Sequence, residues 1–305
     1  MSRNCLDLSR PGRPCGAWWR DRKGGNRTGE RPLSTQDIVL IHGTWGSGGN
    51  WGELADEMVR RGYRVHTPSW RLHGRPGEID IWGSAQKVAR LGLLDYVADL
   101  VALVKSLDAP PVVLGHSVGA LLAQLVAARC RTRGLVLVAP APAAGIFTFY
   151  PSSVLLWGRY IPQWLLGKPM YPVAWGPWRN AVCNAQSEEV AAAAYATLCA
   201  ESGTAYREMI FWYLDRKRAS RVDYAAVGAP VLVLAGSQDK CTPPGMCRAT
   251  ARRFGDDATY VEFEGSDHMM TMGPYLPQTL AAFDRWAARN GLAPGAMRGV
   301  EGAAR

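Results

Sequence analysis

The sequence predicts an α/β fold in which a parallel sheet is built from βαβ units. Short apolar runs rich in β-branched residues alternate with longer segments whose apolar residues recur at helical spacing. Parallel strands need such helical crossovers, so the alternation predicts a parallel sheet. The 305 residues, 48% of them hydrophobic and 20% charged, suit one large core plus an insertion and exclude a wholly disordered chain.

Each expected strand is a short, nearly continuous apolar run, as a strand buried on both faces requires. In chain order these runs are Asp37–Ile41, Tyr63–Thr67, Pro111–Gly115, Gly134–Ala139, Pro230–Ala235 and Ala258–Phe263. The segments between and after them carry apolar residues at helical spacing. Helices are therefore expected at Trp51–Arg61, Tyr96–Leu107, Val118–Arg129, Pro244–Phe254 and Leu276–Arg289.

One stretch breaks this alternation. Residues 140–221 separate two expected strands where a single crossover helix would suffice, which predicts an inserted subdomain. The insert is rich in Trp and Tyr, so it forms either an aromatic cap over a pocket or a small aromatic core of its own. The expected organisation is a disordered basic tail at 1–35, a core at 36–139 and 222–289, the cap at 140–221 and a flexible tail at 290–305.

The net charge of +9 does not by itself indicate a nucleic-acid partner. Residues 1–35 hold eight basic and three acidic side chains without hydrophobic periodicity, which is typical of a basic tail. No apolar run reaches the length of a membrane span, and the first residues lack the apolar region of a signal peptide. We expect a cytoplasmic protein with no membrane span, no nucleic-acid partner and seven mostly unpaired, reduced thiols.

The segment Gly115-His116-Ser117-Val118-Gly119 has the pattern G-x-S-x-G. In a Gly-rich chain the spacing alone is weak, but here it follows an apolar strand and opens an apolar helix. That strand-turn-helix setting is typical of a nucleophile elbow, in which flanking glycines permit a strained turn that raises the serine over the sheet edge. We therefore expect Ser117 to be a nucleophile.

A serine hydroxyl needs a neutral imidazole to take its proton, and the imidazole needs a carboxylate to orient it. His268 follows the last expected strand, where a loop can carry it over Ser117. Asp239 follows the strand before it and is the expected acid. Asp267 adjoins the base and is interpreted as a solvated loop residue, and His116 is expected to hydrogen-bond locally beside the pocket.

A second Gly-rich loop follows the first strand, in His42-Gly43-Thr44-Trp45-Gly46. It lacks the Lys-Ser/Thr ending of a P-loop and the spacing of a dinucleotide-binding loop, which disfavours a nucleotide cofactor. An oxyanion loop fits better, with the backbone N–H groups of Thr44 and Val118 facing the developing alkoxide. Trp45 would then line the substrate pocket.

No metal and no organic cofactor are expected. Cys241 and Cys247 are six positions apart without a His nearby in the sequence, and His66 and His73 lack a matched pair of carboxylates.

The order of these features resembles the α/β-hydrolase superfamily from Gln36 to Ala288: a strand with an HG loop, a strand-GxSxG-helix unit, an insert, an Asp loop and a His loop. The resemblance implies a mostly parallel, doubly wound sheet with helices on both faces, an inserted, mainly helical cap between strands six and seven, and cofactor-independent acyl chemistry. The HG-x-W loop and short cap look similar to small-molecule esterases and carbon–carbon bond hydrolases. Little foldable sequence precedes Asp37, so the first hairpin of the family is expected to be shortened or missing.

These observations favour a serine hydrolase that cleaves an ester, thioester or lactone of a small, largely apolar or aromatic molecule. Fold and triad do not fix the substrate, so a carbon–carbon bond hydrolase, lyase or acyltransferase is an alternative on the same scaffold. A ligand sensor with little turnover is a further alternative, which the complete triad disfavours. The oligomeric state is not predicted.

Overall fold

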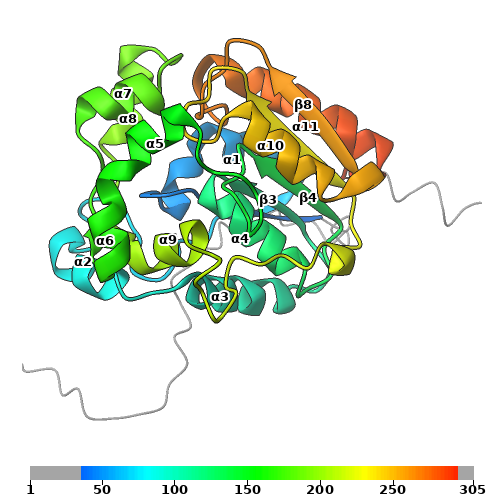
Figure 1. Cartoon of the computed structure of the whole chain (residues 1–305). Coiled ribbons are helices and arrows are strands. Elements are labelled where there is room, and N and C mark those ends of the chain that lie inside the picture. The colour runs from blue at the N-terminus through cyan, green and yellow to red at the C-terminus, as the bar shows by residue number, and fades with distance from the viewer. Residues whose placement is uncertain (1–35, 295–305) are drawn as a thin grey trace, which may run out of the picture.

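A computed structural model of the chain describes residues 36–294 (Figure 1). The predicted tail at 1–35 and most of the predicted tail at 290–305 lie outside the described residues. Among the described helices, none combines the length and the apolar character needed to cross a bilayer.

A six-stranded parallel sheet forms the centre of the protein, with the strand order β2-β1-β3-β4-β7-β8. The strands are β1 (Asp37–Ile41), β2 (Arg64–His66), β3 (Val112–His116), β4 (Gly134–Val138), β7 (Val231–Gly236) and β8 (Ala258–Phe263). The α/β class and the parallel sheet are thus confirmed. The observed end of each strand differs from the predicted end by no more than one residue.

Alternating side chains of each strand build two cores, one on each face of the sheet. Val39 and Ile41 belong to one core, which includes residues of α3 (Leu93–Lys105), α4 (Val118–Ala127) and α10 (Pro244–Arg252). Ile38 and Leu40 belong to the other core, which includes residues of α1 (Gly52–Arg60) and α11 (Leu276–Arg289). Burial on both sides explains why the strands read as continuous apolar runs rather than as alternating ones.

The insert (residues 140–221) leaves the sheet after β4 and returns at β7. It contains five short helices and a two-stranded antiparallel sheet of β5 (Pro169–Met170) and β6 (Glu201–Ser202). The helices are α5 (Pro151–Trp157), α6 (Ile161–Leu166), α7 (Trp175–Ala181), α8 (Glu188–Tyr195) and α9 (Gly203–Ile210). Figure 1 shows them stacked along one side of the sheet, with α7 and α8 at one end and α6 near the other.

Local sequence explains why these helices are short. Prolines lie in the first turns of α5 and α6, and Gly167 ends α6 in a left-handed conformation with φ of 59°. Ser187 and Ser202 cap the N-termini of α8 and α9 with their side chains. Frequent start and stop signals therefore break the insert into one- to three-turn pieces.

One helix differs from expectation: α2 (Ile81–Val88), which Asp80 caps at its N-terminus, was not predicted. The insert follows the fourth strand of the six-stranded sheet, because β1 is the first strand that the described residues contribute. If the superfamily's first hairpin is counted as two strands, this is the expected position between strands six and seven.

Candidate active site

Ser117 occupies the sharp turn between β3 and α4. Its backbone has φ of 56° and ψ of −123°, which L-residues rarely adopt. Two backbone hydrogen bonds hold the turn: Ser117 N donates to Val138 O of β4, and Ala141 N donates to Ser117 O, each at 3.0 Å. The surrounding sheet thus imposes a strained conformation of the kind that gathers at functional sites.

The two glycines of the G-x-S-x-G pattern allow this turn by letting backbones meet. A Cβ atom on Gly115 would lie 2.2 Å from Gly119 O, and one on Gly119 would lie 2.2 Å from His42 O. Both distances are far below van der Waals contact, so any larger residue would push α4 away from β1 and β3.

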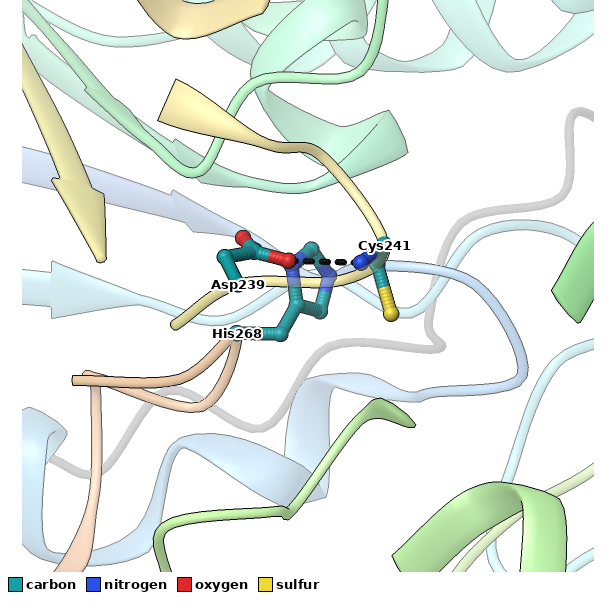
Figure 2. A group of neighbouring side chains, drawn as sticks. All are labelled: Asp239, Cys241 and His268. Atoms are coloured by element: carbon teal, nitrogen blue, oxygen red, sulfur yellow. Dashed lines mark hydrogen bonds and ion pairs between the residues drawn. The ribbon is translucent and has the colours of Figure 1, made fainter. Parts of the chain in front are cut away.

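His268 and Asp239 extend from the loops that follow β8 and β7, and both are buried. His268 Nδ1 donates a hydrogen bond to Asp239 Oδ2 at 2.8 Å. The other carboxylate oxygen, Oδ1, accepts from the backbone N–H of Cys241 at 2.7 Å (Figure 2) and from that of Thr242 at 2.9 Å. With its proton on Nδ1, the imidazole has Nε2 free to accept a proton, and His268 and Ser117 line the same pocket.

Thr242 is a site residue that sequence reasoning missed. Its Oγ1 lies 2.9 Å from Asp239 Oδ2, 3.0 Å from Ala139 O and 3.3 Å from His268 Nδ1. The hydroxyl therefore helps to hold the carboxylate against the imidazole. Its position three residues after Asp239 was visible in the sequence, but the direction of the side chain depends on the fold of the loop.

His116 packs directly on His268, with ring centroids 4.6 Å apart, and it lines the pocket. Its Nε2–H donates to the backbone oxygen of His268 at 2.9 Å. Burial and the neighbouring His268 lower the pKa of His116 to about 3, so its ring stays neutral near pH 7. His116 therefore fixes the backbone of His268 without competing for protons.

The HG loop runs past Ser117 on the opposite side of the pocket. A Cβ atom on Gly43 would lie only 3.0 Å from Ser117 Cβ, which shows how close the loop passes. Within residues 36–294, the backbone N–H groups of Thr44 and Val118 have no protein acceptor. His42 braces the loop: its Nδ1–H donates to Gly43 O, and its Nε2 accepts from Trp70 N.

Contacts from the insert also hold this loop. Thr44 Oγ1 and the Tyr206 hydroxyl are 2.5 Å apart, and Trp45 Nε1 donates to Met170 O at 3.1 Å. Cys199 N donates to Trp45 O at 2.8 Å. The sequence contained no sign of these partners, which lie more than 120 positions away along the chain.

The pocket between these loops is narrow and uncharged. It has a volume of about 60 Å³, and four tryptophans line it: Trp45, Trp51, Trp157 and Trp178. No Asp, Glu, Lys or Arg is among its lining residues. Both interpretations of the aromatic insert hold in part, because Trp157 and Trp178 face the pocket whereas Trp164 stacks on Tyr206 inside the insert.

The interpretation of Asp267 as a solvated loop residue is wrong. Its side chain is fully buried, and its carboxylate accepts hydrogen bonds from Ala185 N at 2.8 Å, Gln186 Nε2 at 3.0 Å and Met269 N at 3.0 Å. Two of these donors belong to the insert. Asp267 thus connects the loop that carries His268 to the insert. The sequence did not show that the insert, which is distant along the chain, covers this side chain.

Asp239, Cys241 and His268 bring a carboxylate oxygen, a thiol and an imidazole nitrogen within 4.8 Å of one another (Figure 2). His268 is thus near Cys241 in space, although no His is near it in the sequence. Their donor atoms already have partners, because the Cys241 thiol donates to Ala181 O and Asp239 accepts from His268 and two backbone N–H groups. Burial also raises the pKa of the Cys241 thiol well above its usual range, which disfavours the thiolate that a metal needs.

All five cysteines within the described part of the chain are unpaired, while Cys5 and Cys15 lie outside it.

The family model described as "Alpha/beta hydrolase family" matches residues 38–283. The chain belongs to the alpha/beta hydrolase family. The match contains both Gly-rich loops, Ser117, the insert, Asp239 and His268, so the resemblance to this superfamily is confirmed at the level of the whole fold. No curated protein is a significant match to the chain.

Solved structures with the same fold have low sequence identity. An extracellular alpha/beta-hydrolase from a Paenibacillus species is 23% identical with a TM-score of 0.62, over 82% of this chain and 98% of that one. A monoacylglycerol lipase from Paleococcus ferrophilus is 22% identical with a TM-score of 0.59, over 84% and 96%. A pyrethroid hydrolase from Sphingobium faniae is 18% identical with a TM-score of 0.62, over 84% and 98%. At these identities the likeness shows the fold of the chain and not its substrate.

Proposed function

We propose that this chain is a serine hydrolase that cleaves an ester, thioester or lactone of a small, neutral, largely apolar or aromatic molecule. The observation that carries the proposal is the 2.8 Å contact between His268 Nδ1 and Asp239 Oδ2, in one pocket with a serine on a strained turn. This is the arrangement in which an imidazole can activate a serine hydroxyl.

In the proposed reaction, Ser117 Oγ attacks the carbonyl carbon while His268 Nε2 takes the hydroxyl proton. The carbonyl oxygen becomes an alkoxide, which accepts hydrogen bonds from the unpaired backbone N–H groups of Thr44 and Val118. The imidazolium then gives its proton to the leaving group, and Asp239 stabilises its charge throughout. A water molecule, activated by the same imidazole, releases the acid from the acyl-enzyme. The reaction needs neither metal nor organic cofactor.

The pocket supports the proposed substrate class. Its lining has no charged side chain to pair with a charged substrate, and transferring an unpaired charge into such a site is costly. Four tryptophans favour flat or branched apolar groups. A monoacylglycerol lipase and a pyrethroid hydrolase among the similar structures agree with ester chemistry. In this proposal the insert is the cap of the site, and residues 36–139 and 222–289 form the catalytic core.

The test is labelling and turnover of the full chain. Wild-type protein should react with a fluorophosphonate probe and hydrolyse short acyl and aryl esters. The Ser117→Ala variant should lose labelling and about 10⁴ to 10⁶ in kcat while keeping its circular dichroism spectrum. Folded wild-type protein that does not react with the probe would favour a ligand sensor, and turnover of β-diketones without turnover of esters would favour carbon–carbon bond cleavage.

A further inference from the structure

Large exposed apolar side chains are concentrated on the insert. Thirteen large hydrophobic residues are exposed in the described part of the chain, and ten of these belong to residues 140–221. The most exposed of the ten include Leu155 at 80%, Leu214 at 71% and Leu166 at 64%. Single exposed apolar residues are ordinary, but a concentration on one segment marks an interaction surface.

Helix α6 is the centre of this concentration. Ile161, Leu165 and Leu166 are exposed on it, while Trp164 is buried and stacks on Tyr206 of α9. Arg207 of α9 donates to Leu165 O, and Phe211 at the end of α9 packs edge-on against Trp164. The exposed Trp212 and Leu214 follow directly along the chain. The C-terminal end of α9 therefore contacts α6 through Phe211, and Trp212 and Leu214 continue the chain from this contact.

Positive charge is also concentrated on the insert. No Asp or Glu occurs from residue 140 to residue 187, a stretch that contains Arg159 and Lys168 beside α6. The whole insert has eight basic and five acidic side chains, and two of the acids, Glu201 and Glu208, are buried. The rest of the described chain has seventeen of each sign. The excess positive charge of the described residues is thus confined to the insert.

We propose that this apolar face binds the surface of an anionic phospholipid bilayer. The apolar face is defined as Ile161, Leu165 and Leu166 of α6 together with Trp212 and Leu214, which follow α9. Arg159 and Lys168 flank α6 along the chain, and the exposed Arg216, Lys217 and Arg218 follow Leu214. Apolar side chains that enter the acyl boundary and cations that meet acidic headgroups together give reversible membrane binding. The inference does not depend on the proposed chemistry, because it concerns only the outer surface of the insert.

The acidic side chains of the insert that are not buried do not oppose this binding. Glu188 and Glu189 lie on α8, at the end of the insert away from α6 (Figure 1). Asp215 uses its carboxylate oxygens to accept from Lys217 N and Ala219 N. A second protein would need acidic groups placed to match each cation, whereas a fluid anionic bilayer supplies negative charge wherever a cation lies.

The experiment measures co-sedimentation of the full chain with vesicles. Pure phosphatidylcholine vesicles are compared with vesicles containing about one third phosphatidylglycerol, at low and high salt. Wild-type protein should bind the anionic vesicles at least about tenfold more tightly than the neutral ones, and salt should weaken the binding. Residues 1–35 are present in every variant, so any binding by these basic residues is common to all.

Two pairs of matched variants test the apolar and the charged components. Leu165→Ser with Leu166→Ser should weaken binding by about tenfold or more, whereas Val59→Ser, at an equally exposed site on α1, should leave it unchanged. Arg159→Gln with Lys168→Gln should weaken binding about 25-fold, since each cation near an anionic surface contributes about fivefold. The control for charge is Arg252→Gln with Arg289→Gln, which removes two exposed cations outside the insert.

Three results would overturn the proposal: wild-type protein that does not bind anionic vesicles, equal binding to neutral vesicles, or insert variants that bind as tightly as their controls. The molar mass in solution gives a separate check. A dimer that dissociates in the Leu165→Ser, Leu166→Ser variant, without vesicle binding by the wild type, would show that a second copy covers the face instead.

Discussion

Asp267→Asn tests how strongly the insert is attached to the loop that carries His268. The carboxylate accepts three N–H groups with its two oxygens, but an asparagine side chain has only one acceptor oxygen. In either orientation its NH₂ group would face at least one N–H donor. A hydrogen bond to a charged acceptor contributes about 1.5–3 kcal/mol, and an unsatisfied buried donor adds a cost, while removing the buried charge offsets part of the loss.

The balance gives an expected destabilisation of about 2–4 kcal/mol, which corresponds to a fall in Tm of about 4–12 °C for a chain of this size. We expect kcat/KM for an ester to fall as well, because the lost contacts adjoin His268. The measurement is urea unfolding at pH 7, with Asp256→Asn as the control because Asp256 is exposed. A free energy of unfolding within about 0.5 kcal/mol of this control would refute the reasoning.

A double-mutant cycle with Gln186→Met measures the contribution of Gln186, one of the two insert residues that donate to Asp267. Gln186 Nε2 donates to Asp267 Oδ1 and to Met269 O, and its own Oε1 has no partner. Because Met269 O also accepts from Met272 N, methionine removes the donor without leaving another group unpaired. Coupling of about 1 kcal/mol or more between the two substitutions is expected. Strict additivity would show that the Gln186 side chain contributes nothing to the attachment, which would leave Ala185 N as the donor from the insert.

Three further predictions concern the site itself. Asp239→Asn should lower kcat by about 10⁴, because an amide cannot hold the Nδ1-protonated tautomer of His268 that the 2.8 Å contact indicates; a loss below tenfold in steady-state kinetics would exclude Asp239 as the acid. Gly119→Ala should abolish both labelling and stable folding, because a Cβ atom would lie 2.2 Å from the backbone oxygens of Ile41 and His42; a folded, active variant in the fluorophosphonate assay would contradict the close approach. His116→Gln should reduce the loss of stability on acidification. The pKa of His116 is about 3 in the folded chain and about 6.5 in the unfolded chain, so between these values the unfolded chain binds one more proton. The stability of the wild type therefore falls as pH drops through that window, by about 2 kcal/mol from pH 7 to pH 5, and equal losses for both proteins in denaturation at these two pH values would contradict this.

The sequence predicted the parts of the candidate site that depend on local pattern and chain order. Ser117 lies on the sharp turn that five consecutive residues predict. Asp239 and His268 lie together because each follows a strand, and the ends of these parallel strands lie at the same sheet edge. Asp267 and Tyr206 could not be predicted, since their partners come from segments distant in the chain. Burial of a polar side chain depends on what covers it, and the short helices of the insert carry no pattern that fixes where they pack.

Helix α2 was missed for a related reason. Its eight residues include Gly83 and bury only Ala85 and Val88, so the hydrophobic period is too short to detect against its surroundings. By contrast α11, with fourteen residues and seven buried positions, begins and ends at the predicted residues. A helix could be predicted from the sequence when its row of buried apolar residues was long enough to show a helical period.

The attachment of the insert to two loops of the candidate site limits how the pocket can be changed. Met170, Cys199 and Tyr206 hold the HG loop from one end, while Ala185 and Gln186 hold the loop of His268 from the other. A grafted insert from another hydrolase would have to reproduce a carbonyl for Trp45 and two N–H donors for Asp267, whatever pocket it encloses. Specificity and catalytic geometry are therefore inherited together in this chain, and point changes to its pocket-lining tryptophans offer a safer route to new substrates than exchange of the segment.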